Sequence, residues 1–185
     1  ALKNMTGVLG AANYVHELMM GVPETMAKFL PAIIFIVACI LAFATGTSWG
    51  TFGILIPIVT VMFGSNTGNP LMIVGISACL AGAVCGDHCS PISDTTIMSS
   101  AGAECEHLNH VATQIPYAIY VAVVSFVCFI IAGFIPVWYI SLPIAVAIMV
   151  GSLFVTKRIL AKKQTVSADA APADAVSENT DITTN

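Results

Sequence analysis

The distribution of charge constrains the fold of this chain more than any other feature. From Phe29 to Thr156 the sequence contains no lysine or arginine. Only 9% of all residues are charged, against about 25% in an ordinary soluble domain, and the mean hydropathy is +0.92. A stretch this long without a cation is not a normal solvated surface, so we expect lipid to surround it. This excludes most soluble enzymes, and the net charge of −4 argues against a nucleic-acid partner.

Two conventional membrane spans are predicted near the C-terminus, over 115–135 and 137–156. Each is long enough to cross a hydrocarbon core of about 30 Å. The second span is followed by four basic residues: Lys157, Arg158, Lys162 and Lys163. Basic residues favour the cytoplasmic side, so we expect a multi-pass protein of the cell membrane with a cytoplasmic C-terminus. Residues 157–185 are expected to form this basic flank and then a disordered acidic tail.

Residues 1–28 are predicted to lie at the membrane surface. Apolar side chains recur three and four positions apart between residues 2 and 22, which is typical of an amphipathic helix. Such a helix lies along the interface or packs beneath the other helices.

A broken apolar segment follows at 29–63. The polar string Gly46–Thr51 separates two arms, 29–45 and 52–63, which would reach about 26 Å and about 18 Å as helices. Each arm is shorter than the hydrocarbon core, and the two together are too long for one crossing. The segment is therefore either a re-entrant hairpin with its tip at mid-membrane or one helix broken in the middle. Both place irregular backbone at depth, where it must be buried in protein or line a cavity.

A second broken segment is predicted at 70–103. Its apolar run ends at Cys85, and Gly86 and Pro91 then bracket a place where a helix should unwind. Proline lacks a backbone N–H, and it disfavours the helical conformation of the residue before it. Ser90 followed by Pro91 also suits the start of a second half-helix. We therefore expect a discontinuous transmembrane helix.

Acids lie at this predicted break. Asp87 and Asp94 fall within an apolar region, where each charge costs about 2.5 to 3.5 kcal/mol at the bilayer centre. They can remain protonated, hold a cation, or pair with a base elsewhere. Hydroxyl oxygens nearby, with carbonyls freed by the break, are hard ligands that suit an alkali cation. These hydroxyls belong to Ser90, Ser93, Thr95 and Thr96.

His88 and the cysteines beside it allow other interpretations. His88 is a candidate proton relay, because imidazole takes up and releases protons. Cys85, His88 and Cys89 could alternatively suggest a membrane zinc enzyme. A second group that could suggest a metal follows at Cys105, His107 and His110. However, zinc sites usually combine Cys pairs with further ligands of matching geometry, and no second Cys pair follows here. We therefore expect no resident metal or cofactor and no enzymatic activity.

Three strings of polar and apolar residues resemble a known family. They are GTSWGTFGILIPI at 46–58, GDHCSPISDTT at 86–96 and HVATQIPYA at 110–118. All three resemble signature regions of the NhaC family of sodium/proton antiporters. The resemblance implies two inverted repeats, each with a re-entrant hairpin followed by a discontinuous helix. It therefore favours the hairpin interpretation of 29–63.

The resemblance also implies roles for individual residues. The cation and proton site would comprise Asp87, Ser90, Ser93 and Asp94, and a hairpin tip formed by Thr47, Ser48 and Thr51 would face it. The implied activity is Na⁺/H⁺ antiport; the alternative is Na⁺- or H⁺-coupled transport of a small organic acid or amino acid.

The resemblance covers one of the two repeats. The expectation is therefore an all-α polytopic chain that forms the C-terminal half of an inverted-repeat transporter. The N-terminal half would be its partner within the bilayer, and a second copy is a further candidate partner.

Overall fold

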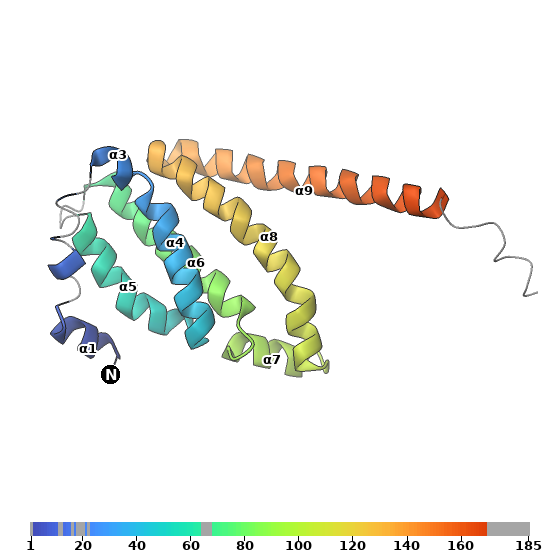
Figure 1. Cartoon of the computed structure of the whole chain (residues 1–185), viewed down its shortest axis with the longest axis horizontal. Coiled ribbons are helices and arrows are strands. Elements are labelled where there is room, and N and C mark those ends of the chain that lie inside the picture. The colour runs from blue at the N-terminus through green and yellow to red at the C-terminus, as the bar shows by residue number, and fades with distance from the viewer. Residues whose placement is uncertain are drawn as a thin grey trace, which may run out of the picture. The chain divides into compact units, whose positions relative to one another are not determined.

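The structure is a computed structural model that describes residues 2–10, 13–15, 17, 21, 23–63 and 68–169. Every regular element in this part of the chain is a helix (Figure 1). The helices are α1 (Leu2–Val8), α3 (Glu24–Ala27), α4 (Leu30–Thr45), α5 (Ser48–Met62), α6 (Pro70–Cys89), α7 (Asp94–Gly102), α8 (His107–Phe134) and α9 (Trp138–Asp169). The chain divides into two units, Ala1–Val146 and Ala147–Asn185, with the boundary inside α9.

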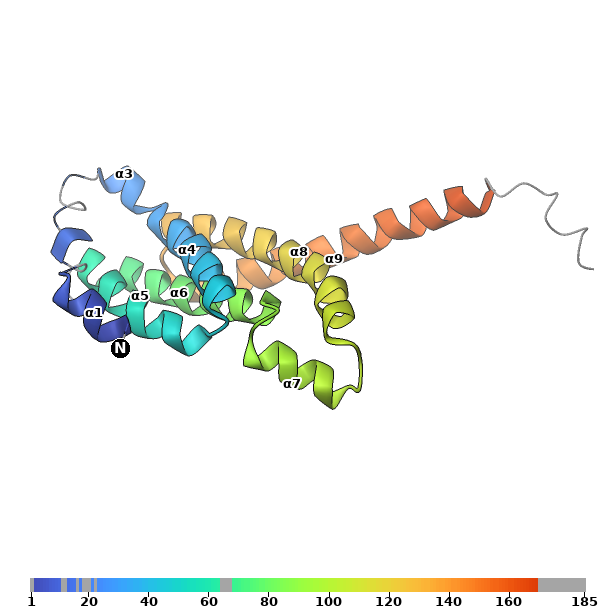
Figure 2. The same ribbon diagram turned by 60° about the horizontal axis from the view of Figure 1, so that its bottom comes forward.

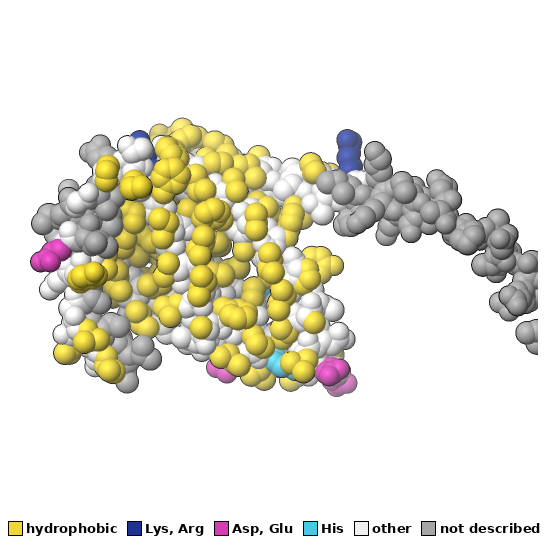
Figure 3. Space-filling model, in the orientation of Figure 1, with side chains coloured by type: hydrophobic (Ala, Val, Ile, Leu, Met, Phe, Trp, Pro, Cys, Tyr) yellow, Lys and Arg dark blue, Asp and Glu magenta, His cyan; other side chains and the backbone are white. Residues whose placement is uncertain are grey.

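Four stretches of the described residues are long and apolar enough to cross a membrane. They are Thr25–Thr45, Pro70–Cys89, His107–Phe134 and Tyr139–Arg158. The apolar helix α5 is shorter. Hydrophobic side chains cover much of the face seen in Figure 3, and the visible acidic and histidine side chains lie at its margins. The prediction of an all-helical chain with several spans is confirmed for this part of the sequence.

Small residues let α4 and α6 pack closely. A Cβ atom at Gly82 would meet the carbonyl of Phe35, and one at Gly86 would meet the carbonyl of Cys39. Because the contacts advance by four residues on both helices, α4 and α6 run parallel. Four fully buried alanines complete the interface: Ala38, Ala42, Ala78 and Ala83. Close packing of small residues is a main source of helix association in lipid, where apolar side chains gain little by leaving the solvent.

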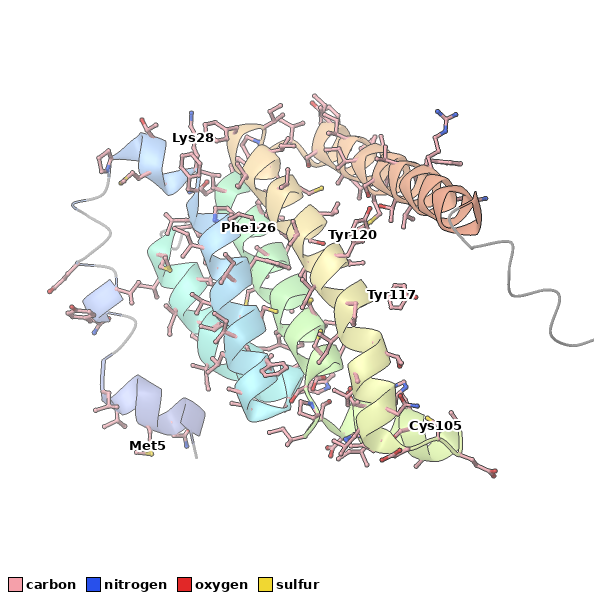
Figure 4. The ribbon with its side chains drawn as sticks, turned by 45° about the vertical axis from the view of Figure 1, so that its right-hand side comes forward. Met5, Lys28, Cys105, Tyr117, Tyr120 and Phe126 are labelled. Carbon is pink, nitrogen blue, oxygen red and sulfur yellow. The ribbon has the colours of Figure 1, made fainter. Side chains whose placement is uncertain are left out.

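Helix α8 runs opposite to α4. Near the end of α8, the ring centre of Phe134 lies 5.2 Å from that of Phe29. Lys28 Nζ lies 5.8 Å from the Phe134 ring centre, beside the start of α4 (Figure 4). The start of α4 and the end of α8 therefore share one end of this bundle. The α4–α5 connection and the break between α6 and α7 lie at its other end, as Figures 1 and 2 show.

An apolar core lies between α4, α5 and α6. Phe126 and Phe129 of α8 pack against it, and Figure 4 shows Phe126 on the side of α8 that faces α4 and α6. The buried members of this core are Leu30, Ile34, Phe35, Val59, Ala78 and Cys79.

The breaks and ends of several helices differ from the sequence-based prediction. Helix α6 does not unwind at Gly86 but continues to Cys89, so the irregular backbone is confined to 90–93. Glycine without a Cβ atom is needed at position 86 for the contact with α4, and a helix accepts it at a cost of about 1 kcal/mol. At about 1.5 Å per residue, α6 alone reaches about 30 Å. Asp87 therefore lies in the last turn of a full-length apolar helix and not midway along a broken one.

Two helices extend beyond the spans that hydropathy marks. Helix α8 begins at His107 and not at 115, because the polar residues 107–114 form its first two turns. Helix α9 continues past 156 to Asp169, through residues such as lysine, arginine, leucine and alanine that favour helix. Residues 157–169 are thus helical, whereas 164–169 were expected to be disordered. Residues 170–185 lie outside the described residues.

The N-terminal segment also departs from one amphipathic helix over 2–22. Helix α1 ends at Val8, and Gly10 adopts a left-handed conformation with a φ of 67°. A left-handed residue ends a helix readily when it is glycine. Several later positions of the expected helix, 18–20 and 22 among them, lie outside the described residues.

Candidate functional site

The break between α6 and α7 brings two helix ends together. Ser90 caps the end of α6, and its N–H donates to the carbonyl of Asp87 at 3.1 Å. Ser93 caps the start of α7, and its hydroxyl accepts the N–H of Thr95 at 3.2 Å. Serine before an α-helix commonly satisfies a free N–H in this way. Pro91, between the two caps, has no N–H to donate and disfavours the helical conformation of Ser90. Proline also lies inside α5, α8 and α9, so the break rests on Pro91 together with the two serine caps.

Asp87 is the buried acid of this site. Its side chain is 8% exposed, and its Oδ1 accepts a hydrogen bond from Ser93 Oγ at 2.6 Å. Ser93 Oγ also lies 2.7 Å from Thr95 Oγ1. A serine hydroxyl has a single hydrogen, which Ser93 gives to Asp87, so Thr95 is the donor to Ser93. The Ser93 hydroxyl thus links a buried carboxylate to Thr95, which is exposed.

The carboxylate of Asp87 has no lysine or arginine close to it in the sequence. None occurs between Phe29 and Thr156, and Lys28 lies beside Phe134 at the opposite end of the bundle (Figure 4). A buried charge without a counter-ion is costly. A proton or a small cation bound by Asp87 would remove that cost.

Asp87 and Asp94 differ in burial. Asp94 is exposed and occupies the first turn of α7, where a negative charge interacts favourably with the helix dipole. Ser90 is fully buried, and its hydroxyl donates to the carbonyl of Phe43 at 2.7 Å, which connects α6 to the end of α4. Side-chain hydrogen bonds join three of the residues predicted to bind a cation or proton: Asp87, Ser93 and Thr95.

The connection between α4 and α5 contacts the break through a glycine. Gly46 adopts a left-handed conformation with a φ of 66°, and a Cβ atom there would lie 3.0 Å from the carbonyl oxygen of Ile92. The predicted tip hydroxyls bond within the tip. Thr47 Oγ1 accepts the N–H of Gly50 at 3.4 Å, and Thr51 Oγ1 donates to the carbonyl of Thr47 at 3.0 Å. Ser48 and Thr51 are buried.

We expect Gly46→Ala to destabilise this contact. The left-handed conformation costs about 1 to 2 kcal/mol for a residue with a Cβ atom, and the new methyl group would also press on Ile92. Thermal unfolding of the purified full-length protein in detergent measures the loss. Gly53→Ala is the matched control, because nothing lies within 4 Å of its Cβ position. Equal unfolding temperatures for the two variants would contradict the expectation.

Two side chains of α8 hold the irregular segment. His107 Nε2 lies 2.7 Å from the carbonyl oxygen of Pro91, and Gln114 Nε2 donates to the carbonyl of His88 at 3.1 Å. A carbonyl only accepts, so His107 carries a proton on Nε2. The two residues are seven positions apart, and Val111 between them is buried. Both residues precede the span predicted at 115–135, although their spacing of two helical turns is a signal for a shared helical face.

The buried face of α7 is also polar. Thr96 and Ser100 are 2% and 3% exposed. Thr96 Oγ1 donates to the carbonyl of His88 at 3.2 Å, while Ser100 Oγ lies 3.0 Å from His107 Nδ1. The side chain of His88, the predicted proton relay, is exposed. At this position it is the backbone carbonyl that takes part in the site, because it accepts hydrogen bonds from Thr96 and Gln114.

The alternative of a zinc enzyme gains no support from the geometry. Among the described residues, no group of three or more histidine, cysteine, aspartate or glutamate side chains could hold a metal ion. Cys85 and Cys89 are free and half-buried.

A comparison with known families agrees with the apolar, helical character of the chain. The sequence model of the Na⁺/H⁺ antiporter family matches residues 1–134. The chain belongs to this family. Together with the four apolar helices, membership establishes an integral membrane protein related to antiporters. No solved structure matches the chain.

Three relatives illustrate the range of the family. An uncharacterized protein of Haemophilus influenzae is 47% identical over 72% of this chain and 25% of its own length. The malate-2H⁺/Na⁺-lactate antiporter of Bacillus subtilis is 37% identical over 54% of the chain and 21% of its own length. The arginine/ornithine antiporter of Halobacterium salinarum is 35% identical over 59% of the chain and 22% of its own length. The chain thus spans about a quarter of the length of these relatives.

Proposed function

We propose that this chain carries the ion-coupling site of a secondary active transporter of the NhaC type, which exchanges Na⁺ for H⁺ across the cell membrane. The observation that carries the proposal is Asp87, a buried carboxylate that a hydroxyl stabilises and that has no ion pair with a lysine or arginine among the described side chains. Intramembrane acids of this kind commonly serve ion or proton pathways.

Exchange follows if proton and cation compete for the same carboxylate. With a proton bound, Asp87 is neutral and can donate a hydrogen bond to Ser93, which would then donate to Thr95. With Na⁺ bound, Asp87 is a charged ligand and Ser93 donates to it, as observed. The hydroxyl pair can therefore satisfy either state by reversing its direction of donation, since each hydroxyl both donates and accepts.

The remaining parts of the transporter belong to the proposal as well. Helices α4 and α5 would form the re-entrant hairpin, and α6 with α7 would form the discontinuous helix of one inverted repeat. The other repeat would be supplied by the N-terminal half of the full-length protein. The basic residues around Lys157 would place the C-terminus in the cytoplasm.

Proton flux in liposomes tests the proposal. The full-length protein is reconstituted with a pH-sensitive dye inside, and Na⁺ is added outside with the membrane potential clamped. We expect the interior to become more alkaline, because Na⁺ entry drives proton exit. Competition for one carboxylate also predicts that the Na⁺ concentration for half-maximal flux rises as the pH falls. Equal traces with Na⁺ and with choline would contradict the proposal.

A second candidate is the exchange of small organic solutes. Two named relatives are antiporters of malate and lactate and of arginine and ornithine, which favours this candidate. Uptake of these four radiolabelled solutes by the same liposomes separates the two functions. Accumulation that depends on a Na⁺ or pH gradient supports the second candidate, and Na⁺-driven proton flux without solute uptake contradicts it.

A further inference from the structure

We infer that the amide oxygen of Gln114, on α8, is a ligand of the cation that binds at Asp87. This inference rests on the proposed function and adds a residue from a third helix to its site. The amide nitrogen of Gln114 donates to the carbonyl of His88, the residue next to Asp87. A carbonyl can only accept, so the nitrogen must face His88. The amide oxygen must therefore face another direction.

That oxygen has no partner in the described part of the chain. Gln114 Oε1 is buried and accepts no hydrogen bond. Buried polar atoms almost always have a partner, so an orphaned acceptor at this position requires a donor or a cation. The amide cannot be turned to satisfy it, because the oxygen would then face the oxygen of His88.

The carbonyl groups of the break explain why a side-chain oxygen is needed. A helix break ordinarily frees backbone carbonyls to coordinate an ion. Here four of these carbonyls already accept hydrogen bonds: those of Asp87, His88, Ser90 and Pro91. Their donors are the N–H of Ser90, the side chains of Thr96 and Gln114, the N–H of Ser93 and the ring of His107. A carbonyl has two lone pairs, so that of His88, which accepts two hydrogen bonds, is fully used. Side-chain oxygens are therefore the further candidates to complete the ligands of a cation at Asp87.

Gln114 is suitably placed to supply one of them. The carbonyl of His88 receives both Gln114 from α8 and Thr96 from α7, so the three helices meet at the end of α6 where Asp87 lies. An amide oxygen is a neutral, hard ligand of the kind that alkali cations accept. Because Asp87 supplies the charge, a neutral second ligand would adjust selectivity without adding a second buried anion.

The experiment compares Na⁺ and Li⁺ as drivers of proton flux by the full-length protein in liposomes. Gln114→Leu removes the oxygen at similar volume, and we expect the half-maximal Na⁺ concentration to rise about tenfold, with a changed Na⁺/Li⁺ preference. Gln114→Glu keeps an oxygen at this position and should retain cation-driven flux. It also provides a second variant if the leucine protein does not fold.

Two further variants separate a ligand from a structural residue. Thr113→Val is the matched control, because Thr113 is exposed and bonds only to its own helix; its flux should equal that of the wild type. His107→Ala removes the other side chain that holds the break, so it should lower the maximal rate equally for both cations.

The inference is overturned if Gln114→Leu behaves like His107→Ala, with both cations slowed alike and unchanged half-maximal concentrations. Wild-type flux that no Gln114 variant alters overturns it as well and leaves the proposed function standing. Absence of cation-driven flux in the wild type overturns both.

Discussion

We expect Asp87→Asn to abolish Na⁺-driven proton flux in liposomes. Asparagine has nearly the shape of aspartate, and its oxygen can still accept the hydrogen bond from Ser93. It can neither carry a proton nor supply a negative charge, so both halves of the proposed exchange fail. The loss of a charged ligand alone weakens binding by about 10- to 100-fold, and the loss of the proton carrier should reduce exchange to that of protein-free liposomes.

The same substitution at Asp94 provides the matched control. Asp94 is exposed at the start of α7, so Asp94→Asn should cost only the interaction with the helix dipole, about 0.3 to 1 kcal/mol. We expect this variant to retain most of the flux. Thermal unfolding shows whether both variants are folded. Equal loss of flux in two folded variants would contradict the assignment of Asp87 as the central acid.

The second large effect is expected at the contact between α4 and α6. Gly86→Ala would place a methyl group against the carbonyl of Cys39, and a backbone carbonyl cannot move aside without shifting its helix. Overpacking of this kind costs about 1 to 3 kcal/mol and occasionally more. We expect the loss of stability to reach or exceed about 3 kcal/mol, the upper end of this range. It would be seen as a lower unfolding temperature and a lower yield of purified protein. Gly82→Ala, facing the carbonyl of Phe35, should behave similarly.

Gly102→Ala is the control for these substitutions. It lies at the end of α7, and nothing lies within 4 Å of its Cβ position, so its stability should change by less than about 0.5 kcal/mol. If Gly86→Ala were as stable as Gly102→Ala, that result would contradict the close contact between α4 and α6 at Gly86.

The sequence predicts the membrane and the break well, because both depend on local chemistry. The absence of cations between Phe29 and Thr156 indicates lipid wherever the helices lie. Pro91, with Ser90 and Ser93 as caps on either side, favours a break over 90–93. By contrast, Gly86 indicates a break when read alone. Its contact with Cys39 shows that it serves helix packing instead, and only the position of α4 reveals this.

The distinction between Asp87 and Asp94 could not be predicted for a related reason. Both are acids beside a predicted break. Which of them becomes buried depends on how the chain turns between α6 and α7, and the sequence does not show this. Ser93 caps α7 and reaches back to Asp87, while Asp94 begins the next helix and remains exposed. Gln114 and His107 were missed because hydropathy marks where a helix is apolar. It does not mark where the helix begins, so the predicted span starts at 115 and omits the first two turns of α8.

The parallel contact of α4 with α6 limits how the protein can move. Backbone approaches at Gly82 and Gly86 and the hydrogen bond from Ser90 to Phe43 connect the two helices along half their length. Such an interface leaves no room for α4 to slide along α6, because a shift along the helix axis would bring the carbonyls of α4 against side chains of α6 in place of its glycines. If the protein works as proposed, we expect the two helices to move together and to carry Asp87 with them. Alternating access to the two sides of the membrane would then arise at the outer surfaces of this pair.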